Sequence, residues 1–173
     1  LPRLLGASIK RLITSAKRSN TACIFINQTR STMAMYGSPT TAPGGKALKF
    51  GAKIILPLEQ ISESVLKPGL IAVKPGNPIL QEELFGPLGI VMVAKNDEDA
   101  LEMANNVPFG LANSVWTKNK KRQQYFIKNL ESGTVNVNKM TSSDPRLPFG
   151  GMKKSGYGTE LSYHTLHEFV TVK

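Results

Sequence analysis

Apolar positions recur at two different periods along the chain, and together they predict alternating helices and strands. Residues 4–18 place apolar side chains at helical spacing, which predicts a helix. Residues 21–27 form a short apolar run, as expected of a strand that is buried on both faces. Residues 28–45 are polar and rich in Gly and Pro, which predicts a long functional loop. A further strand is expected over residues 47–56.

The segment at residues 57–78 contains four prolines, which break regular structure. We therefore place a boundary between two parts of the chain near Leu66. Beyond it the pattern again alternates, which argues for an α/β fold. The expected elements are strands at 89–95, 111–117, 134–138 and 168–173, helices at 96–105 and 118–131 (the second stopping at Gly133), and a Gly/Pro-rich loop at 144–158.

Composition narrows the class of protein. Hydrophobic residues make up 40% of the chain, as in globular proteins, and no apolar run approaches the length of a membrane span. The one cysteine, Cys23, excludes an internal disulfide and fits a cytoplasmic location. His164 and His167 stand three residues apart without a third ligand, so we expect structural histidines and no metal site.

Positive charge is concentrated in the first part of the chain. The net charge is +10, and residues 1–66 carry nine Lys and Arg against two Glu, whereas residues 67–173 carry thirteen against ten Asp and Glu. A basic surface favours phosphate-rich partners, although a solubilising surface explains the charge equally well.

Residues 20–52 read NTACIFINQTRSTMAMYGSPTTAPGGKALKFGA and resemble the second half of the ATP-binding core of bacterial RecA recombinases. The resemblance implies that Gln28, at the end of a strand, senses the γ-phosphate of ATP. It also implies that Lys49 and Phe50 lie at a filament subunit interface. The predicted loop at residues 28–45 would contact single-stranded DNA through Arg30, Met33, Met35, Tyr36, Gly44 and Gly45.

The phosphate-binding half of that ATPase core has no counterpart in the sequence. A P-loop requires G-x-x-x-x-G-K-[ST], but Gly45-Lys46 is followed by Ala47, and Thr40 stands where the first Gly belongs. ATP and Mg²⁺ are therefore implied by resemblance alone, and we expect no ATP hydrolysis by this chain.

Four strings in the second part of the chain, LQEELFGP, NNVPFGLANSVWT, SGTVNVN and DPRLPFGGMKKSGYGTELS, resemble the C-terminal third of NAD(P)-dependent aldehyde dehydrogenases. The last string is most similar to succinate-semialdehyde and related dehydrogenases. The resemblance implies that Glu83 accepts hydrogen bonds from the nicotinamide ribose and that Phe85 packs against the nicotinamide of NAD or NADP. It also implies that Ser143 and Phe149 line the aldehyde tunnel, and that the closing strand begins a segment that pairs across subunits.

Three further features have a structural and a functional interpretation. Arg146 could attract an acidic substrate, or it could be an ordinary surface residue. Asp97, Glu98 and Asp99 are better explained by the start of a helix than by a metal site. The dehydrogenase family uses a cysteine nucleophile, but Cys23 lies in an apolar run and is interpreted as a small core residue. No catalytic residue is therefore assigned.

The expected architecture is a RecA-like core segment over residues 1–66 followed by an aldehyde dehydrogenase catalytic-domain segment over residues 67–173. The favoured hypothesis is a fusion that catalyses neither parent reaction unaided. One alternative is a dehydrogenase fragment that works when its missing part is supplied. Another is a module that binds single-stranded DNA through the basic loop without ATP. Self-association through unpaired strands is expected, and a membrane partner is not.

Overall fold

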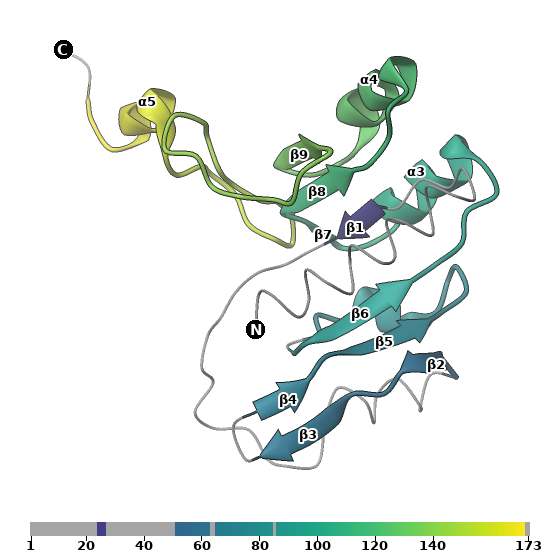
Figure 1. The fold of residues 1–173 in the computed structure, drawn as a ribbon. Helices are drawn as coiled ribbons and strands as arrows, with labels where there is room; N and C mark the ends of the chain where they lie inside the picture. Colours follow the sequence, from purple (N-terminus) through teal and green to yellow (C-terminus); the bar gives the residue numbers. More distant parts are fainter. Residues whose placement is uncertain (1–23, 27–50, 63–64, 85, 172–173) are drawn as a thin grey trace. The chain divides into compact units, whose positions relative to one another are not determined.

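The computed structural model describes residues 24–26, 51–62, 65–84 and 86–171, and Figure 1 traces them along the chain. They fall into two compact units, one made of Leu1–Arg30 and Lys95–Lys173 and the other of Ser31–Ala94. Each unit contains a pair of parallel strands, and helices alternate with strands in the longer unit. The expected α/β class is confirmed.

The unit Ser31–Ala94 is built on a three-stranded sheet. Strand β5 (Gly69–Ala72) lies in the middle, antiparallel to β2 (Lys53–Leu56) and parallel to β6 (Leu88–Val91). Ile71 and the fully buried Ile79, on the short 3₁₀ helix η1 (Pro78–Gln81), form the core with Val73. The side chain of Asn77 accepts a 3.0 Å hydrogen bond from the amide of Ile79 and so fixes the start of η1.

Residues 57–78 do not lack regular structure, so that expectation is wrong. They contain β5 and a hairpin of β3 (Glu59–Ser62) and β4 (Val65–Lys67), which a 2.8 Å ion pair between Lys67 and Glu59 closes. Pro57 and Pro68 lie between strands, where their missing amide hydrogen removes no ladder bond. The expected boundary near Leu66 falls inside β4.

The sheet of the other unit has β8 (Ala112–Val115) in the middle, parallel to β9 (Thr134–Val137) and antiparallel to β1 (Ile24–Ile26). All four residues of β8 are buried, as expected for a central strand. Strands are thus present within all three predicted ranges, 21–27, 111–117 and 134–138, and the second and third are shorter than predicted. The four residues of β9 are all half-buried.

Two helices accompany this sheet, and both begin at an asparagine cap. The side chain of Asn96 accepts from the amide of Asp99 at the start of α3 (Asp97–Asn105), and Asn119 does the same at the start of α4 (Lys120–Asn129). Three acids occupy the first turn of α3, where the helix dipole favours negative charge, which confirms the predicted helix start. A 2.6 Å ion pair between Arg122 and Asp97 joins the two helices.

The end of α4 and the end of the chain both differ from expectation. Helix α4 ends because Leu130 turns to extended backbone, so Gly133 is not its cap. The strand predicted over 168–173 is absent from its described part: Glu168 belongs to the 3₁₀ helix η2 (Leu166–Glu168), which follows α5 (Ser162–Thr165), and residues 169–170 form a bend. A strand needs a hydrogen-bonded neighbour, and no described strand pairs with this segment.

The predicted helix at 4–18 and the predicted loop at 28–45 lie outside the described residues. Within the described ranges, no helix combines the length and the apolar character needed to cross a membrane.

Candidate functional site

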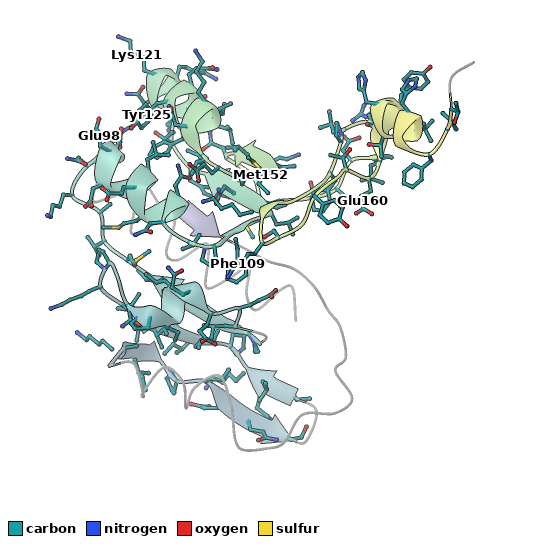
Figure 2. All side chains as sticks on the ribbon, turned by 180° about the vertical axis from the view of Figure 1, so that it is seen from behind. Glu98, Phe109, Lys121, Tyr125, Met152 and Glu160 are labelled. Carbon is teal, nitrogen blue, oxygen red and sulfur yellow. The ribbon has the colours of Figure 1, made fainter. Side chains whose placement is uncertain are left out.

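Residues 138–162 form an arm that leaves the end of β9 and leads to α5 (Figure 1). Strand β10 (Met152–Lys153) returns to the base of the arm and pairs with β7 (Phe109–Gly110). Figure 2 shows the labelled Phe109 and Met152 at this base and Glu160 farther along the arm. Phe149 and Glu160 exchange backbone hydrogen bonds of 2.8 and 2.7 Å, which hold neighbouring passes of the chain together.

Backbone strain is concentrated in this arm. Four residues other than glycine have a positive φ in the described part of the chain, Asn138, Lys153, Leu161 and Ser162, and all four lie within residues 138–162. Such conformations cost about 1–3 kcal/mol each and persist where surrounding contacts impose them, most often at binding and catalytic sites. The strain therefore marks the arm as the candidate site of this unit.

Glycines allow the passes of the arm to approach through their backbones. A Cβ on Gly133 would contact the carbonyl oxygen of Gly150, and a Cβ on Gly150 would contact that of Gly158. A Cβ on Gly151 would lie 2.6 Å from the carbonyl oxygen of Ser155. Gly150 and Gly151 of the FGGMKKSGYG string are thus required by packing, because no larger residue fits at these approaches.

The two predicted tunnel residues both lie on the arm. Ser143 is exposed and directly precedes the turn at residues 144–147, which a 3.0 Å hydrogen bond from the amide of Leu147 to the carbonyl oxygen of Asp144 closes. Phe149 is half-buried and is held by its bridge to Glu160. No hydrogen bond joins Ser143 to Phe149 among the described residues, and the structure places both on one segment.

Arg146 is occupied by a neighbour on the same turn. Its Nε and Nη2 donate to the two carboxylate oxygens of Asp144 at 2.9 and 2.7 Å, and its amide donates to the same carboxylate at 3.0 Å. These bonds hold the pKa of the Asp144 carboxyl below its usual range, and they raise the pKa of Arg146. Because the guanidinium is 86% exposed and already paired, the interpretation as a surface residue fits better than a role in binding acidic substrates.

The sequence did not indicate a role for two residues of the arm, Asn138 and Lys153. Asn138 donates to the carbonyl oxygen of Thr117 at 3.0 Å and accepts from its amide at 2.9 Å, which ties the start of the arm to the end of β8. Asparagine tolerates positive φ better than most residues, so its position after a strand was a usable signal. Lys153 also has positive φ, and nothing in the sequence indicates that for a lysine.

Glu83 belongs to the other unit and lies between η1 and β6. It is half-buried, and its carboxylate makes no hydrogen bond or ion pair with any residue the structure describes. The adjacent Leu84 packs against the core, and the carbonyl oxygen of Pro87 accepts a 2.9 Å bond from the amide of Gly69, so both sides of Glu83 are anchored. Phe85 lies outside the described residues.

The residues assigned by resemblance to RecA also lie outside the described ranges, so their roles stay predictions: Gln28, Arg30, Met33, Met35, Tyr36, Gly44, Gly45, Lys49 and Phe50. His164 and His167 are exposed, and each packs edge-on against the ring of Tyr163. Among the described residues, no group of three or more His, Cys, Asp or Glu is arranged to hold a metal ion.

Comparison with known proteins identifies one family. A sequence model described as the aldehyde dehydrogenase family matches residues 40–173. A succinate-semialdehyde dehydrogenase [NADP(+)] of Mycobacterium leprae is 51% identical over 92 residues, which cover 53% of this chain and 20% of that protein. A probable succinate-semialdehyde dehydrogenase [NADP(+)] of Synechocystis is 46% identical over 104 residues, covering 60% of this chain and 23% of that one.

Solved structures agree with the sequence comparison. The succinic semialdehyde dehydrogenase of Streptococcus pyogenes, solved with NADP+ as the cofactor, superposes with a TM-score of 0.63 at 36% identity, over 67% of this chain and 26% of that one. An indole-3-acetaldehyde dehydrogenase in complex with NAD+ gives a TM-score of 0.70 at 32% identity, over 75% and 27% of the two chains.

The extent of these matches bears on the earlier expectations. The chain spans about a fifth of the length of the curated relatives it matches. Residues 40–66 fall both in the family match and in the segment that resembles RecA. A family match over residues 40–173 includes both the arm and the Glu83 segment, and the chain therefore belongs to the aldehyde dehydrogenase family.

Proposed function

We propose that residues 67–173 supply the substrate-lining arm and a cofactor-side carboxylate of an NAD(P)-dependent aldehyde dehydrogenase that acts on succinate semialdehyde. The observation that supports this most is the arm, with its positive-φ residues and the bridge between Phe149 and Glu160. The chain is also similar in sequence to succinate-semialdehyde dehydrogenases. The resulting reaction is oxidation of the aldehyde to the acid.

The Glu83 segment fits a nicotinamide cofactor. A carboxylate offers acceptors only, and the two hydroxyls of a ribose are donors that match it. Glu83 has no described partner, so its oxygens are available to these hydroxyls. When bound, NAD(P)⁺ supplies a hydride acceptor for the aldehyde carbon.

The arm would recognise the far end of the substrate. In this proposal the exposed hydroxyl of Ser143 donates to the substrate carboxylate, and Phe149 provides an apolar wall along the carbon chain. Arg146 takes no part, because Asp144 already occupies its donors. Because the Ser143 hydroxyl is neutral, its contact with the substrate leaves the ion pair of Asp144 and Arg146 intact.

The nucleophile and the general base would come from outside this chain. Residues 40–173 contain no cysteine, and Cys23 precedes the matched span. Thiol chemistry in this family requires an activated cysteine beside the aldehyde carbon. We therefore propose that the chain is inactive alone, and that its place of action is the cytoplasm.

Transfer of the segment into a relative tests the proposal. Residues 67–173 would replace the matching segment of the Mycobacterium leprae enzyme, and oxidation of succinate semialdehyde would be followed by absorbance of the reduced nicotinamide. We expect turnover, and we expect Ser143→Ala to raise KM for succinate semialdehyde while leaving KM for butyraldehyde unchanged. Butyraldehyde is the matched control because it has the same carbon chain without the carboxylate. Equal KM changes for both aldehydes would exclude Ser143 as the partner of the carboxylate.

We also propose that residues 1–66 derive from a RecA recombinase, which makes the chain a fusion whose junction lies in the overlap with the family match at residues 40–66. Their support is the motif at residues 20–52 and the excess of basic residues. An uninterrupted reading frame in single genomic reads across codons 55–80 is the expected result, and a frame break there would contradict one continuous polypeptide.

A second candidate function follows from the same segment, namely binding of single-stranded DNA without ATP. Its test is fluorescence anisotropy of labelled oligo-dT against salt concentration. Several phosphate contacts predict a steep loss of affinity as salt rises. Affinity that is insensitive to salt would exclude contacts with the phosphate backbone.

A further inference from the structure

The side chain of Lys153 ends at the C-terminus of α3, far from its own position in the sequence. Its Nζ donates to the carbonyl oxygen of Asn105 at 2.6 Å and to that of Val107 at 3.2 Å, and it lies 2.6 Å from a carboxylate oxygen of Glu131. An ammonium has three donors, so these acceptors use all of them. These three oxygens form a cage around the ammonium that is partly open to solvent, since the Lys153 side chain is 24% exposed and that of Glu131 is 54% exposed.

Helix α3 lacks a cation of its own at this end. Its first turn has three acids, and its last turn has no basic residue. The negative end of the helix dipole favours a positive charge beside the last carbonyls. Lys153 supplies that charge from the returning pass of the arm.

The cage is a junction of several elements. The side chain of Asn105 donates to the carbonyl oxygen of Asn129 at 2.8 Å and accepts from the amide of Glu131 at 3.0 Å, which joins the end of α3 to the end of α4. Lys153 thus attaches to a junction at which two helix ends are already hydrogen-bonded to each other. The connection matters because Lys153 lies only four residues after Phe149.

The backbone around Lys153 is fixed as well. Lys153 pairs with Phe109, the amide of Lys154 donates to the carbonyl oxygen of Pro108 at 2.9 Å, and the amide of Gly110 donates to Ser155 Oγ at 3.0 Å. Lys153 nevertheless has a φ of 56°, which glycine adopts far more readily. A lysine at this position costs conformational energy, and the three contacts of its ammonium provide the compensation.

We propose that Lys153 is the positioning residue of the arm: its ammonium acts as a tethered cation that locks the returning pass to the ends of α3 and α4. Locking this pass keeps Phe149 and its bridge to Glu160 in place. What the arm binds rests on the proposed dehydrogenase function, but the lock itself does not.

Amide hydrogen exchange of the full chain tests the lock without substrate or turnover, so its failure is separate from failure of the proposed function. Lys153→Met keeps the length and removes the charge. We expect exchange at the amides of Phe149 and Glu160 to accelerate at least about tenfold, because hydrogen bonds from charged groups stabilise more than neutral ones. The amide of Leu130, at the end of α4, is the internal control and should keep its protection. Lys153→Arg should restore most of the protection of the arm.

A second variant separates the charge from the backbone. Lys153→Gly removes the ammonium and at the same time relieves the positive φ, so backbone strain no longer contributes. Methylammonium chloride should restore protection of Phe149 and Glu160 in this variant, whereas tetramethylammonium chloride, which has no N–H donors, should not. Unchanged exchange in Lys153→Met, loss of protection at Leu130 together with the arm, or equal rescue by the two salts would each overturn the proposal.

Discussion

Replacement of Gly150 by alanine tests the backbone approaches that shape the arm. An added Cβ would contact the carbonyl oxygen of Gly158 and would lie 3.1 Å from Cγ2 of Thr159. The first obstacle is backbone, so it moves only if the neighbouring pass of the arm moves. That displacement pulls on the bridge between Phe149 and Glu160, which consists of hydrogen bonds of 2.8 and 2.7 Å.

The expected destabilisation follows from these contacts. Two backbone hydrogen bonds contribute about 1 kcal/mol each, which agrees with the roughly 1–3 kcal/mol typical of overpacking. Loss of glycine also stiffens the unfolded chain, which favours folding by about 0.4–1 kcal/mol. We therefore expect Gly150→Ala to lower the free energy of unfolding by about 1–2 kcal/mol net.

Urea denaturation followed by tryptophan fluorescence measures this change. Trp116 is the one tryptophan of the chain and directly follows β8, so its emission reports on the unit that carries the arm. Ser142→Ala is the control on the same arm: Ser142 is exposed and its side chain makes no hydrogen bond with any described residue, so this change should leave stability nearly unaltered. If Gly150→Ala were as stable as the wild type, the close approach at Gly150 would not be a real constraint.

Three further predictions concern caps, charges and the core. Asn96→Ala should lower the free energy of unfolding by about 1 kcal/mol in urea titrations, because it removes the cap of α3. In an NMR titration of side-chain carboxyl carbons, Asp144 should titrate below the usual aspartate range, so its pairing is present at neutral pH and is lost only as pH falls through that lowered pKa; Arg146→Gln should move the midpoint back up. Phe126→Ala, at a fully buried position, should cost about 3–5 kcal/mol in the same denaturation assay, whereas Ile127→Ala at its half-exposed neighbour should cost far less.

Local signals in the sequence predicted the helices better than the sheets. Asn96 and the acids after it are a cap with a favourable first turn, and α3 begins where they indicate. The run at residues 111–117 predicts a strand, and β8 lies within it. For α3 the deciding interactions are formed within a few residues, whereas β8 also depends on its pairing with β1 and β9.

Long-range contacts account for what the sequence did not predict. Residues 57–78 form strands because β5 pairs with β2 and β6 and β3 pairs with β4. Pro57 and Pro68 stand between these strands and interrupt none of them, and a count of prolines does not reveal that placement. The strand expected after residue 168 has no described partner, so the same residues form a turn of 3₁₀ helix and a bend. The cage around Lys153 joins residues up to 48 positions apart. No local pattern encodes such a contact.

The candidate site shows the same division. Motif strings correctly indicated the aldehyde dehydrogenase family, and Ser143 and Phe149 lie on one arm of the fold. The pairing of Arg146 with Asp144 was recognised only in the structure, because the sequence alone left both interpretations of Arg146 open. Side-chain pairing within a turn decides between them.

Succinate-semialdehyde oxidation by two proteins prepared side by side is the most direct test of the central claim. One is the chain as it stands, and the other is the Mycobacterium leprae enzyme carrying residues 67–173 of this chain. We predict reduced nicotinamide from the grafted enzyme and none from the chain alone. Turnover by the chain that survives Cys23→Ala, or a folded grafted enzyme without turnover, would contradict the account.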